Sequence, residues 1–366
     1  MRVLGLCSYP IESAATRYRL AQFIEPLAKK GVDLTVSPFF DSKRFKLHYE
    51  KKSPIEKFLG LGKPILQRIL EVSQVHKFDL LFIQREAIFF GPAFFERLFQ
   101  IVGSCPMVLD LDDATYIRYI SPTYGKIGSL FKFFGKTDSL IKKAEIVTCG
   151  NRHIAEYVEL QGTKSVVIPT VVDINEFQPV EKTNNSIPIV GWIGTHSTFP
   201  FLRSIFPVLE KLGKKHEFIL KIVGAGTDEI ELKGVKVENL QWSLDREIAD
   251  FQSFDIGLYP MSKSSSANEE WLIGKSGFKA VQYMAVGIPF VMTPIGVCAE
   301  IGEPDKTHFN ARTEEEWMFS LNKLLSDANL RKEMGKRGRR FSLNNFTVPA
   351  QAELLAQTFY TVCKKR

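Results

Sequence analysis

The sequence predicts an α/β protein built from two doubly wound domains, each with a parallel sheet covered by helices. Three observations lead to this prediction: a length of 366 residues, short apolar runs that alternate with helical patterns, and a polar linker near the middle. A chain of this length exceeds what one hydrophobic core usually serves. Strand patterns that alternate with helix patterns are typical of parallel sheets with crossover helices.

Six apolar runs bounded by turn residues predict the strands of an N-terminal domain over residues 1–180. They are residues 3–6, 33–39, 79–83, 107–111, 145–150 and 165–170. The first run begins almost at the start of the chain and leads directly into a turn. We therefore expect the segment MRVLGLCSYP to form a buried strand rather than a signal peptide.

A second series of strand patterns follows the linker PVEKTNNSIP, whose Pro, Asn and Ser content is typical of a domain boundary. These strands are predicted at residues 189–194, 218–226, 254–260 and 289–293. The second domain is expected over 181–345, with a basic turn in the run GKRGRRFS near its end. The amphipathic segment 346–366 predicts a final helix that packs on the first domain.

Composition and charge exclude several classes of protein. The chain is 45% apolar and 24% charged, with a formal net charge of +7. It has no apolar run of about 18 residues, which argues against a membrane-spanning helix. The cysteines are scattered singly, so neither a disulfide framework nor a zinc site is indicated. We expect a cytoplasmic protein.

Polar residues gather where the predicted strands end, and open α/β sheets bind ligands beyond the carboxyl ends of their strands. In the first domain they are Arg17, Arg19, Arg85, Glu86, Asp110, Asp112 and Asp113. In the second domain they are Gly194, Thr195, His196, Ser197, Thr198, Gly224 and Trp242. The two edges are expected to face a central cleft.

The stretch from Gly274 to Thr293 predicts a polar loop, a helix and a buried strand. Apolar residues from Phe278 onward fall at helical spacing, and Gly287 with Pro289 ends the helix. Lys275 and Lys279, together with the N–H groups of a helix start, are suited to bind a diphosphate. Gln282 is expected on nearly the same face as Gly274.

Several of these residues have a simpler explanation. Arg17 and Arg19 are predicted to open the first helix, where basic residues oppose the dipole, so either an anion accompanies them or they are solvated. Ser197 and Thr198 either bind phosphate oxygens or cap a helix. The aspartates at 110–113 either bind a metal ion or form a loop network, and the loop network is favoured.

Two segments, 42–68 and 126–143, mix lysines with aromatic residues. This mixture suits an anionic membrane surface or a nucleic acid, and the simpler alternative is buried phenylalanine beside solvated lysine. No nucleic-acid-binding motif accompanies the segments, so nucleic acid is not an expected partner.

Taken together, the motifs VGWIGTHST, IVGAG, DIGLYP and MAVGIP resemble those of the retaining GT-B glycosyltransferases of family 4. In the N-terminal half, TRYRLAQF, FIQRE, LDLDDA and IPTVVDINEF resemble a branch whose acceptor often belongs to a surface polysaccharide or glycolipid. The resemblance implies transfer of a sugar from a nucleoside diphosphate sugar, with retention and without a metal cofactor. It further implies that the second domain binds the donor, with its base near Trp242.

The chain departs from the family pattern at the catalytic motif. Gly274 and Gln282 stand where relatives carry a pair of acidic residues, which leaves Lys275 and Lys279 as the expected catalytic cations. Asp112 stands where relatives often place a histidine, so Asp112 or Asp113 is expected to act catalytically on the sugar or acceptor side. Two other functions therefore remain open, a non-catalytic sugar-nucleotide-binding partner and a peripheral membrane scaffold.

Overall fold

The computed structural model describes residues 1–49, 60–118, 133, 135–182, 187–226, 228–262 and 269–364. Its internal contacts divide the chain into two compact units. Unit 1 comprises Met1–Thr170 and Val348–Arg366, and unit 2 comprises Val171–Thr347. Each unit contains one six-stranded parallel sheet, which confirms the predicted α/β class with two doubly wound sheets.

The sheet of unit 1 has the strand order β2-β1-β3-β4-β5-β6. Its strands are β1 (Arg2–Cys7), β2 (Asp33–Pro38), β3 (Leu80–Gln84), β4 (Met107–Leu111), β5 (Ile146–Cys149) and β6 (Ser165–Val167). Each strand lies within, or within a residue of, one of the six predicted apolar runs. The runs predict well because β3, β4 and β5 are buried along their whole length.

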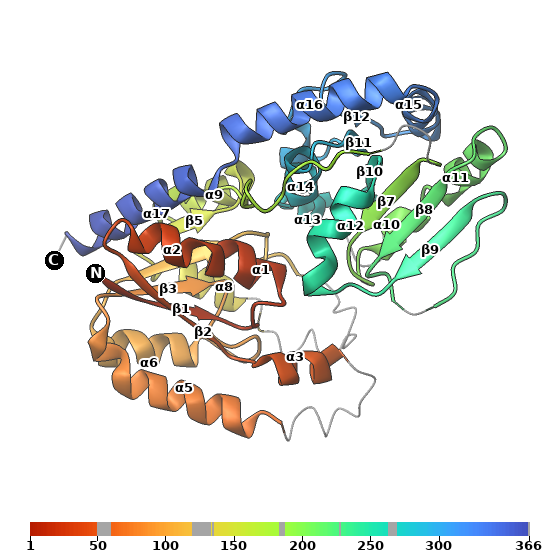
Figure 1. Ribbon diagram of the computed structural model, residues 1–366. Coiled ribbons are helices and arrows are strands. Elements are labelled where there is room, and N and C mark those ends of the chain that lie inside the picture. Colours follow the sequence, from red (N-terminus) through yellow and green to blue (C-terminus); the bar gives the residue numbers. More distant parts are fainter. Residues whose placement is uncertain are drawn as a thin grey trace. The chain divides into compact units, whose positions relative to one another are not determined.

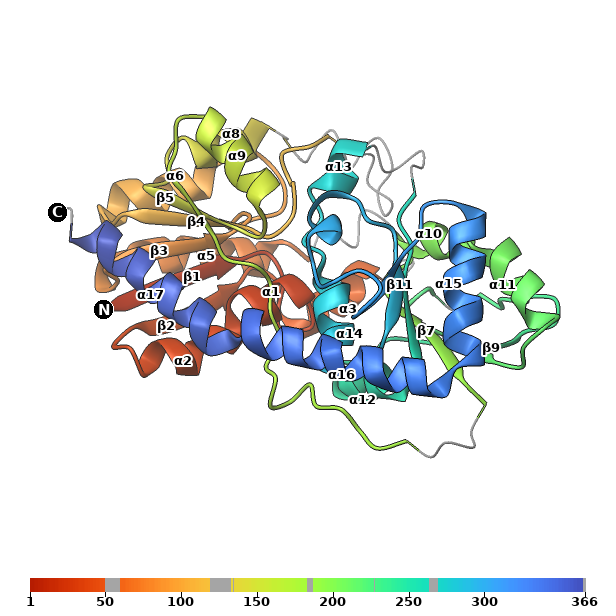
Figure 2. The same cartoon turned by 90° about the horizontal axis from the view of Figure 1, so that it is seen from above.

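Helices cover both faces of this sheet (Figure 1). One face carries α1 (Ala14–Arg19), η1 (Ala21–Phe23), α2 (Ile24–Ala28) and α17 (Val348–Cys363). The other face packs against α5 (Gly62–Gln74), η2 (Val75–Lys77), α6 (Phe94–Gly103), α8 (Gly135–Ile141) and α9 (Arg152–Leu160). The terminal helix α17 lies beside α2, so the chain returns to unit 1 as expected (Figure 2). The short helix α3 (Ser42–Tyr49) follows β2.

The sheet of unit 2 has the order β12-β11-β10-β7-β8-β9. Its strands are β7 (Ile189–Ile193), β8 (Ile219–Val223), β9 (Lys236–Leu240), β10 (Ile256–Tyr259), β11 (Phe290–Met292) and β12 (Phe309–Asn310). The predicted strands of this half correspond to β7, β8, β10 and β11. The sequence did not predict β9 and β12, because β9 is a polar edge strand and β12 has only 2 residues.

The helices of unit 2 also form two layers. One layer contains α10 (Phe199–Arg203), α11 (Phe206–Gly213) and α15 (Glu314–Ser326), whose apolar side chains share a core with the sheet. On the other side are η3 (Leu244–Arg246), α12 (Glu247–Ser253), α14 (Phe278–Ala285) and α16 (Ala328–Asn345). The remaining short helices, α13 (Glu269–Ile273) and η4 (Gly296–Ala299), lie at the sheet's carboxyl edge.

The predicted basic turn at GKRGRRFS is wrong, because residues 335–342 lie inside the continuous helix α16. The two glycines that suggested a turn bring α16 close to α14. A methyl group at Gly335 would lie 2.0 Å from the carbonyl oxygen of Gly287, and one at Gly338 would lie 3.3 Å from Met284. These glycines therefore serve helix packing rather than a chain reversal.

The predicted position of Arg17 and Arg19 at a helix start is also wrong. Both residues lie in the last turn of α1, where basic side chains interact favourably with the helix dipole. The dipole therefore gives no reason to require an anionic ligand at these arginines.

Candidate functional site

The carboxyl ends of β7, β8 and β9 meet through close backbone contacts in unit 2. Gly194 donates its N–H to Val223 over 2.9 Å, and Gly224 donates to Leu240 over 2.9 Å. Gly224 has φ +85°, and a methyl group on it would lie 2.2 Å from the carbonyl oxygen of Gly194 and 3.4 Å from Trp242. The structure thus brings together three of the predicted donor-binding residues.

The loop 194–198 presents hydroxyl groups at this edge. Thr195 and Ser197 share a hydrogen bond of 2.7 Å between their hydroxyls, and the Thr198 hydroxyl donates to the Thr195 carbonyl over 3.2 Å. Thr198 precedes α10 but makes no side-chain capping bond to it. Its hydroxyl closes the loop instead, so the simple capping explanation is not what the structure shows. Thr195 and His196 are exposed.

The segment 274–279 places two lysines against aromatic rings. The Lys275 ammonium lies 3.7 Å from the centroid of the Trp271 ring, and the Lys279 ammonium lies 5.4 Å from that of Tyr259. Burial raises the pKa of the Cys298 thiol to about 12, while both lysines act to lower it. Gly277 lies between the two lysines in sequence, and a methyl group there would lie 3.5 Å from the Cys298 sulfur, so this turn packs against the buried thiol.

Gly274 and Gln282 do not share a helix, contrary to the predicted face. Helix α14 begins at Phe278 with Gly277 as its cap, so Gly274 and Lys275 lie in the loop that follows α13. Gly277 has φ +66°, and a methyl group there would lie 2.3 Å from the Ile301 side chain. Gln282 is buried on α14. The predicted helix itself is confirmed.

The sequence missed a group of charged residues that holds the loop after β9. Arg246 donates through Nε to Asp250 over 2.9 Å and also donates to the carbonyl oxygen of Gln241. Asp250 is buried and lies 3.0 Å from the Lys221 ammonium on β8. These contacts fix the segment that leads to Trp242. Only the i,i+4 spacing of Arg246 and Asp250 on the chain could have indicated part of this network.

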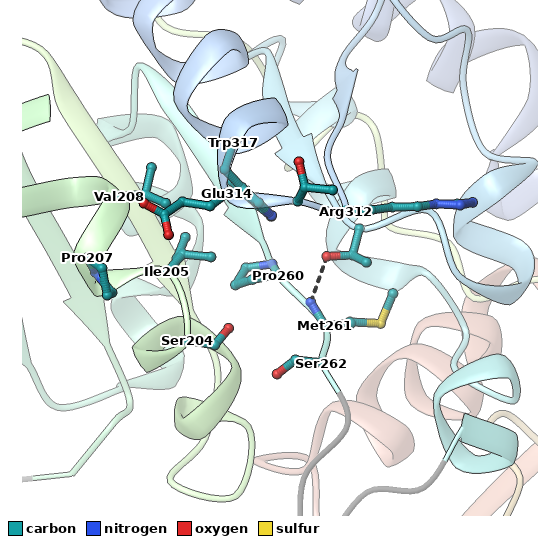
Figure 3. A pocket seen from close by; sticks show the side chains of 12 residues that line it. Ser204, Ile205, Pro207, Val208, Pro260, Met261, Ser262, Arg312, Glu314 and Trp317 are labelled. Carbon is teal, nitrogen blue, oxygen red and sulfur yellow. Dashed lines mark hydrogen bonds between the residues drawn. The ribbon is translucent and has the colours of Figure 1, made fainter. Parts of the chain in front are cut away.

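A pocket of about 130 Å³ lies at the ends of β10 and β11 (Figure 3). It is lined by Ser204, Ile205, Pro207, Val208, Pro260, Met261, Ser262, Thr293, Arg312, Thr313, Glu314 and Trp317. The Met261 N–H donates to the Thr293 hydroxyl over 3.0 Å within it. None of the predicted donor-binding residues lines this pocket, which the sequence did not predict.

In unit 1, Arg85, Asp112 and Asp113 form an ion-pair network at the ends of β3 and β4. Arg85 binds both carboxylate oxygens of Asp112, over 2.6 and 2.7 Å, and Asp113 over 3.3 Å. Arg85 adopts φ +60°, a strained conformation for a residue other than glycine. Burial alone would raise the pKa of Asp112, but Arg85 and then Arg19 bring it below its ordinary value.

Two further predicted residues of unit 1 are held by internal ion pairs. Arg19 is buried and binds Asp110 through two hydrogen bonds of 3.0 and 2.5 Å, and Thr148 also donates to Asp110 over 2.6 Å. Glu86 lies 3.8 Å from the buried Lys136 ammonium. Arg17 donates to the backbone oxygens of Ile11 and Glu12 over 2.7 and 3.2 Å.

The basic aromatic segments are described only in part, since residues 50–59, 119–132 and 134 lie outside the described ranges. Within the described part, the Phe45 ring packs against Tyr9 at 5.5 Å, and Lys43 and Lys46 are exposed. Lys136 is buried rather than solvated and lies 2.9 Å from Glu96. The described residues therefore combine packed aromatics with both solvated and buried lysines.

Over the ranges that the structure describes, no group of three or more His, Cys, Asp or Glu side chains is arranged to hold a metal ion. The aspartates at 110–113 instead bind the arginines Arg19 and Arg85. This favours the loop-network explanation for these aspartates.

Comparison with known proteins gives a fold but no sequence family. No protein-family model matches the chain, and no curated protein matches it by sequence. Solved structures match it over nearly its whole length, with low identity. A sucrose-phosphate synthase from Thermosynechococcus elongatus superposes with a TM-score of 0.69 at 14% identity, covering 100% of both chains.

Two other solved structures agree. HepE of Anabaena in complex with UDP-glucose gives a TM-score of 0.69 at 16% identity over 99% of this chain and 100% of that chain. A glycosyltransferase from Rickettsia africae gives 0.67 at 15% identity over 100% and 99%. These structures share the GT-B architecture, and the chain therefore has the GT-B fold. At these identities the likeness defines the fold alone.

Proposed function

We propose that the protein is a glycosyltransferase that moves a sugar from a nucleoside diphosphate sugar to a glycan or glycolipid acceptor. One observation carries the proposal: the carboxyl edge of unit 2 combines a hydroxyl-rich loop, close-packed glycines and two lysines that lie against aromatic rings. Such an edge suits an anionic, hydroxyl-bearing donor. The similarity in fold to HepE, crystallised with UDP-glucose, supports a donor of this class.

In this proposal Lys275 and Lys279 are the catalytic cations. Negative charge develops on the diphosphate as it leaves the sugar, and positioned cations stabilise that charge in the transition state. The rings of Trp271 and Tyr259 lie against the two ammonium groups and help to position them. The lysines take the place of a metal ion in this scheme, and the reaction is proposed to retain the anomeric configuration.

The remaining edge residues orient the donor. The hydroxyls of Thr195, Ser197 and Thr198 are proposed to bind phosphate or sugar oxygens, since hydroxyl groups both donate and accept. Trp242 offers a half-buried ring beside Gly224, where the base can stack. Gly224 itself lets the backbone approach the ligand closely. His196 and Gln282 complete the proposed donor-binding set.

Unit 1 is proposed to bind the acceptor through the ends of β3 and β4. Asp113 and Glu86 are half-buried, and their carboxylates suit the hydroxyl groups of a sugar acceptor. Asp112, Arg85 and Arg19 position this edge through their mutual ion pairs. The resemblance to the family 4 enzymes supports a surface polysaccharide or glycolipid as the acceptor.

A non-catalytic sugar-nucleotide-binding protein is the second candidate. The observation that favours it is the absence of acidic residues at Gly274 and Gln282, where the resembling family carries them. Donor binding alone would not separate the two candidates, because both predict it. Turnover separates them.

The test has two stages. Thermal unfolding is first measured with UDP, GDP, ADP and their common sugar derivatives, because a ligand that binds only the folded state raises Tm. The stabilising donor is then incubated with the protein, and release of the nucleoside diphosphate is followed with and without glycan acceptors. Stabilisation with turnover supports the enzyme, and stabilisation without turnover on any acceptor supports the binding protein. No stabilisation by any nucleotide sugar would refute both.

A further inference from the structure

Helix α5 has an inverted amphipathic pattern. Its inner face buries Arg68, which is 0% exposed and donates to the carbonyl oxygens of Cys7 and Ser37 over 2.8 and 3.0 Å. Its outer face carries Leu66, Ile69 and Leu70, exposed by 56%, 52% and 54%. These three positions follow i, i+3, i+4 spacing, so they form one apolar stripe on the surface.

Helix α6 has the same inverted amphipathic pattern, with a charged residue buried and apolar residues exposed. Glu96 is 1% exposed and lies 2.9 Å from the buried Lys136 ammonium, while Phe94, Ile101 and Val102 are exposed by 57%, 74% and 48%. Helices α5 and α6 pack side by side on the same face of the unit 1 sheet (Figure 1). The six exposed apolar residues therefore define one surface, which we term the α5–α6 face.

The exposed charged side chains of α5 and α6 are both basic. Lys63 on α5 and Arg97 on α6 are exposed, whereas the acidic residues of the two helices face other partners. Glu96 is buried against Lys136, and Glu71 binds Arg68 over 2.5 Å. Burial and then the neighbouring Arg97 lower the pKa of Lys143, so like positive charges lie close together beside α6.

We propose that the α5–α6 face docks onto an anionic lipid bilayer. Leu66, Ile69, Leu70, Phe94, Ile101 and Val102 would enter the boundary between headgroups and acyl chains. Lys63 and Arg97 would contact the anionic headgroups. An apolar face flanked by basic residues binds membranes through buried apolar area together with electrostatic attraction. No described helix has the length and apolar character needed to cross a bilayer, so the proposed contact is a surface contact.

The experiment is co-sedimentation of the full chain with phosphatidylcholine vesicles, with and without phosphatidylglycerol. We expect binding only when phosphatidylglycerol is present, and weaker binding in high salt. The variant L66S/I69S/L70S should bind about tenfold more weakly or worse, because apolar area drives insertion. The control F319S/L343S/L354S changes three apolar residues outside this face, exposed by 59%, 40% and 40%, and should bind like the wild type.

A charge variant tests the second component. K63Q/R97Q should lose roughly fivefold in binding for each basic side chain removed. Its control, K306Q/K336Q, removes two exposed lysines of unit 2 and should change little.

Three results would overturn the proposal. One is failure of the wild type to bind anionic vesicles at low salt, and another is equal loss of binding in the α5–α6 variant and its control. The third is a dimer in sedimentation velocity that L66S/I69S/L70S dissociates, because a second copy would then cover the face. Unchanged Tm of each variant shows that the fold is intact. The measurement uses no sugar nucleotide, so it fails or succeeds independently of the proposed activity.

Discussion

The cations at the carboxyl edges of the two sheets contact different kinds of groups. In unit 1, the cations Arg19 and Arg85 each bind an aspartate, Asp110 and Asp112, at distances of 2.5–3.0 Å. In unit 2, the cations Lys275 and Lys279 lie over aromatic rings. A carboxylate attracts a cation through its full charge, whereas an aromatic ring attracts it more weakly through its quadrupole.

This difference indicates that the edge of unit 1 has a structural role and the edge of unit 2 a ligand-binding role. The arginine–aspartate pairs of unit 1 join α1 to β4 and the end of β3 to the end of β4, so they fix the edge. The lysines of unit 2 are the cations that the proposed diphosphate would contact. Substitutions in unit 1 should therefore change stability first, and substitutions in unit 2 should change activity first.

The largest expected effect is on stability, from Asp110→Asn. Arg19 is then left buried without its carboxylate partner, and breaking a buried pair in this way costs about 3–5 kcal/mol of unfolding free energy. Urea unfolding measures the loss. The control Glu353→Gln breaks the exposed pair with Lys30 and should leave the urea midpoint nearly unchanged. Equal losses of unfolding free energy in both variants would show that the buried Arg19–Asp110 pair stabilises the fold no more than the exposed pair does.

The second expected effect is on turnover, from Lys279→Ala. Loss of one group that stabilises the leaving diphosphate should lower kcat by about 10²–10³-fold, with Tm close to that of the wild type. Lys306→Ala, on the exposed surface of unit 2, is the control and should keep full kcat. Steady-state kinetics with the donor identified by thermal shift provide the measurement. A stability loss without a change in kcat would show that Lys279 has a structural role, which contradicts the role proposed for the edge of unit 2.

Much of the fold could be predicted because buried strands are short apolar runs between turn residues. The elements that were missed or mispredicted lack that signal. Three of the five residues of β9 are polar, and the glycines of α16 look like turn residues although they face Gly287 and Met284. Of the site, the strand-end positions were predictable from the α/β pattern. The partners were not, because the Arg19 contact with Asp110 spans 91 residues of sequence.

The third prediction concerns the pH dependence of stability, which is expected to differ between the two units. His308 is buried in unit 2, stacks on Phe290 at 4.9 Å, and donates through Nε2 to the side-chain oxygen of Asn310 over 3.2 Å. Burial lowers its pKa from 6.5 to about 4. Between pH 4 and pH 6.5 the unfolded chain therefore binds a proton at His308 more readily than the folded chain does. The stabilisation is complete above pH 6.5 and is lost as the pH falls toward 4.

The full loss from His308 amounts to about 3 kcal/mol. Asp112 in unit 1 has its pKa lowered below the ordinary 3.8, so its contribution persists until the pH falls beneath that value. Unit 2 should consequently lose protection first on acidification. Hydrogen exchange of peptides from both units at pH 7, 5.5 and 4.5 measures this order. In His308→Asn the difference between units should shrink, while His76→Gln, at an exposed histidine of unit 1, should preserve it.

The smallest expected effect comes from a pair of glycines in one loop of unit 2. Gly224 and Gly226 both have positive φ, +85° and +124°, so alanine is strained at either position. Only at Gly224 would the methyl group also meet a neighbour, the Gly194 carbonyl oxygen at 2.2 Å, whereas nothing lies within 4 Å at Gly226. The difference in stability loss between Gly224→Ala and Gly226→Ala therefore measures the effect of the close contact between the ends of β7 and β8.

We expect Gly224→Ala to lose about 1–2 kcal/mol more stability than Gly226→Ala, since a packed site must shift to admit the methyl group. The displaced 194–198 loop should also weaken donor affinity in Gly224→Ala alone. Urea unfolding and calorimetric titration of the donor measure the two effects. If both variants bind the donor like the wild type, the glycine contact serves the fold of unit 2 and the donor-binding role of this loop is refuted. Weakened binding in Gly224→Ala with only a small loss of stability would show that the same close contact shapes the donor site.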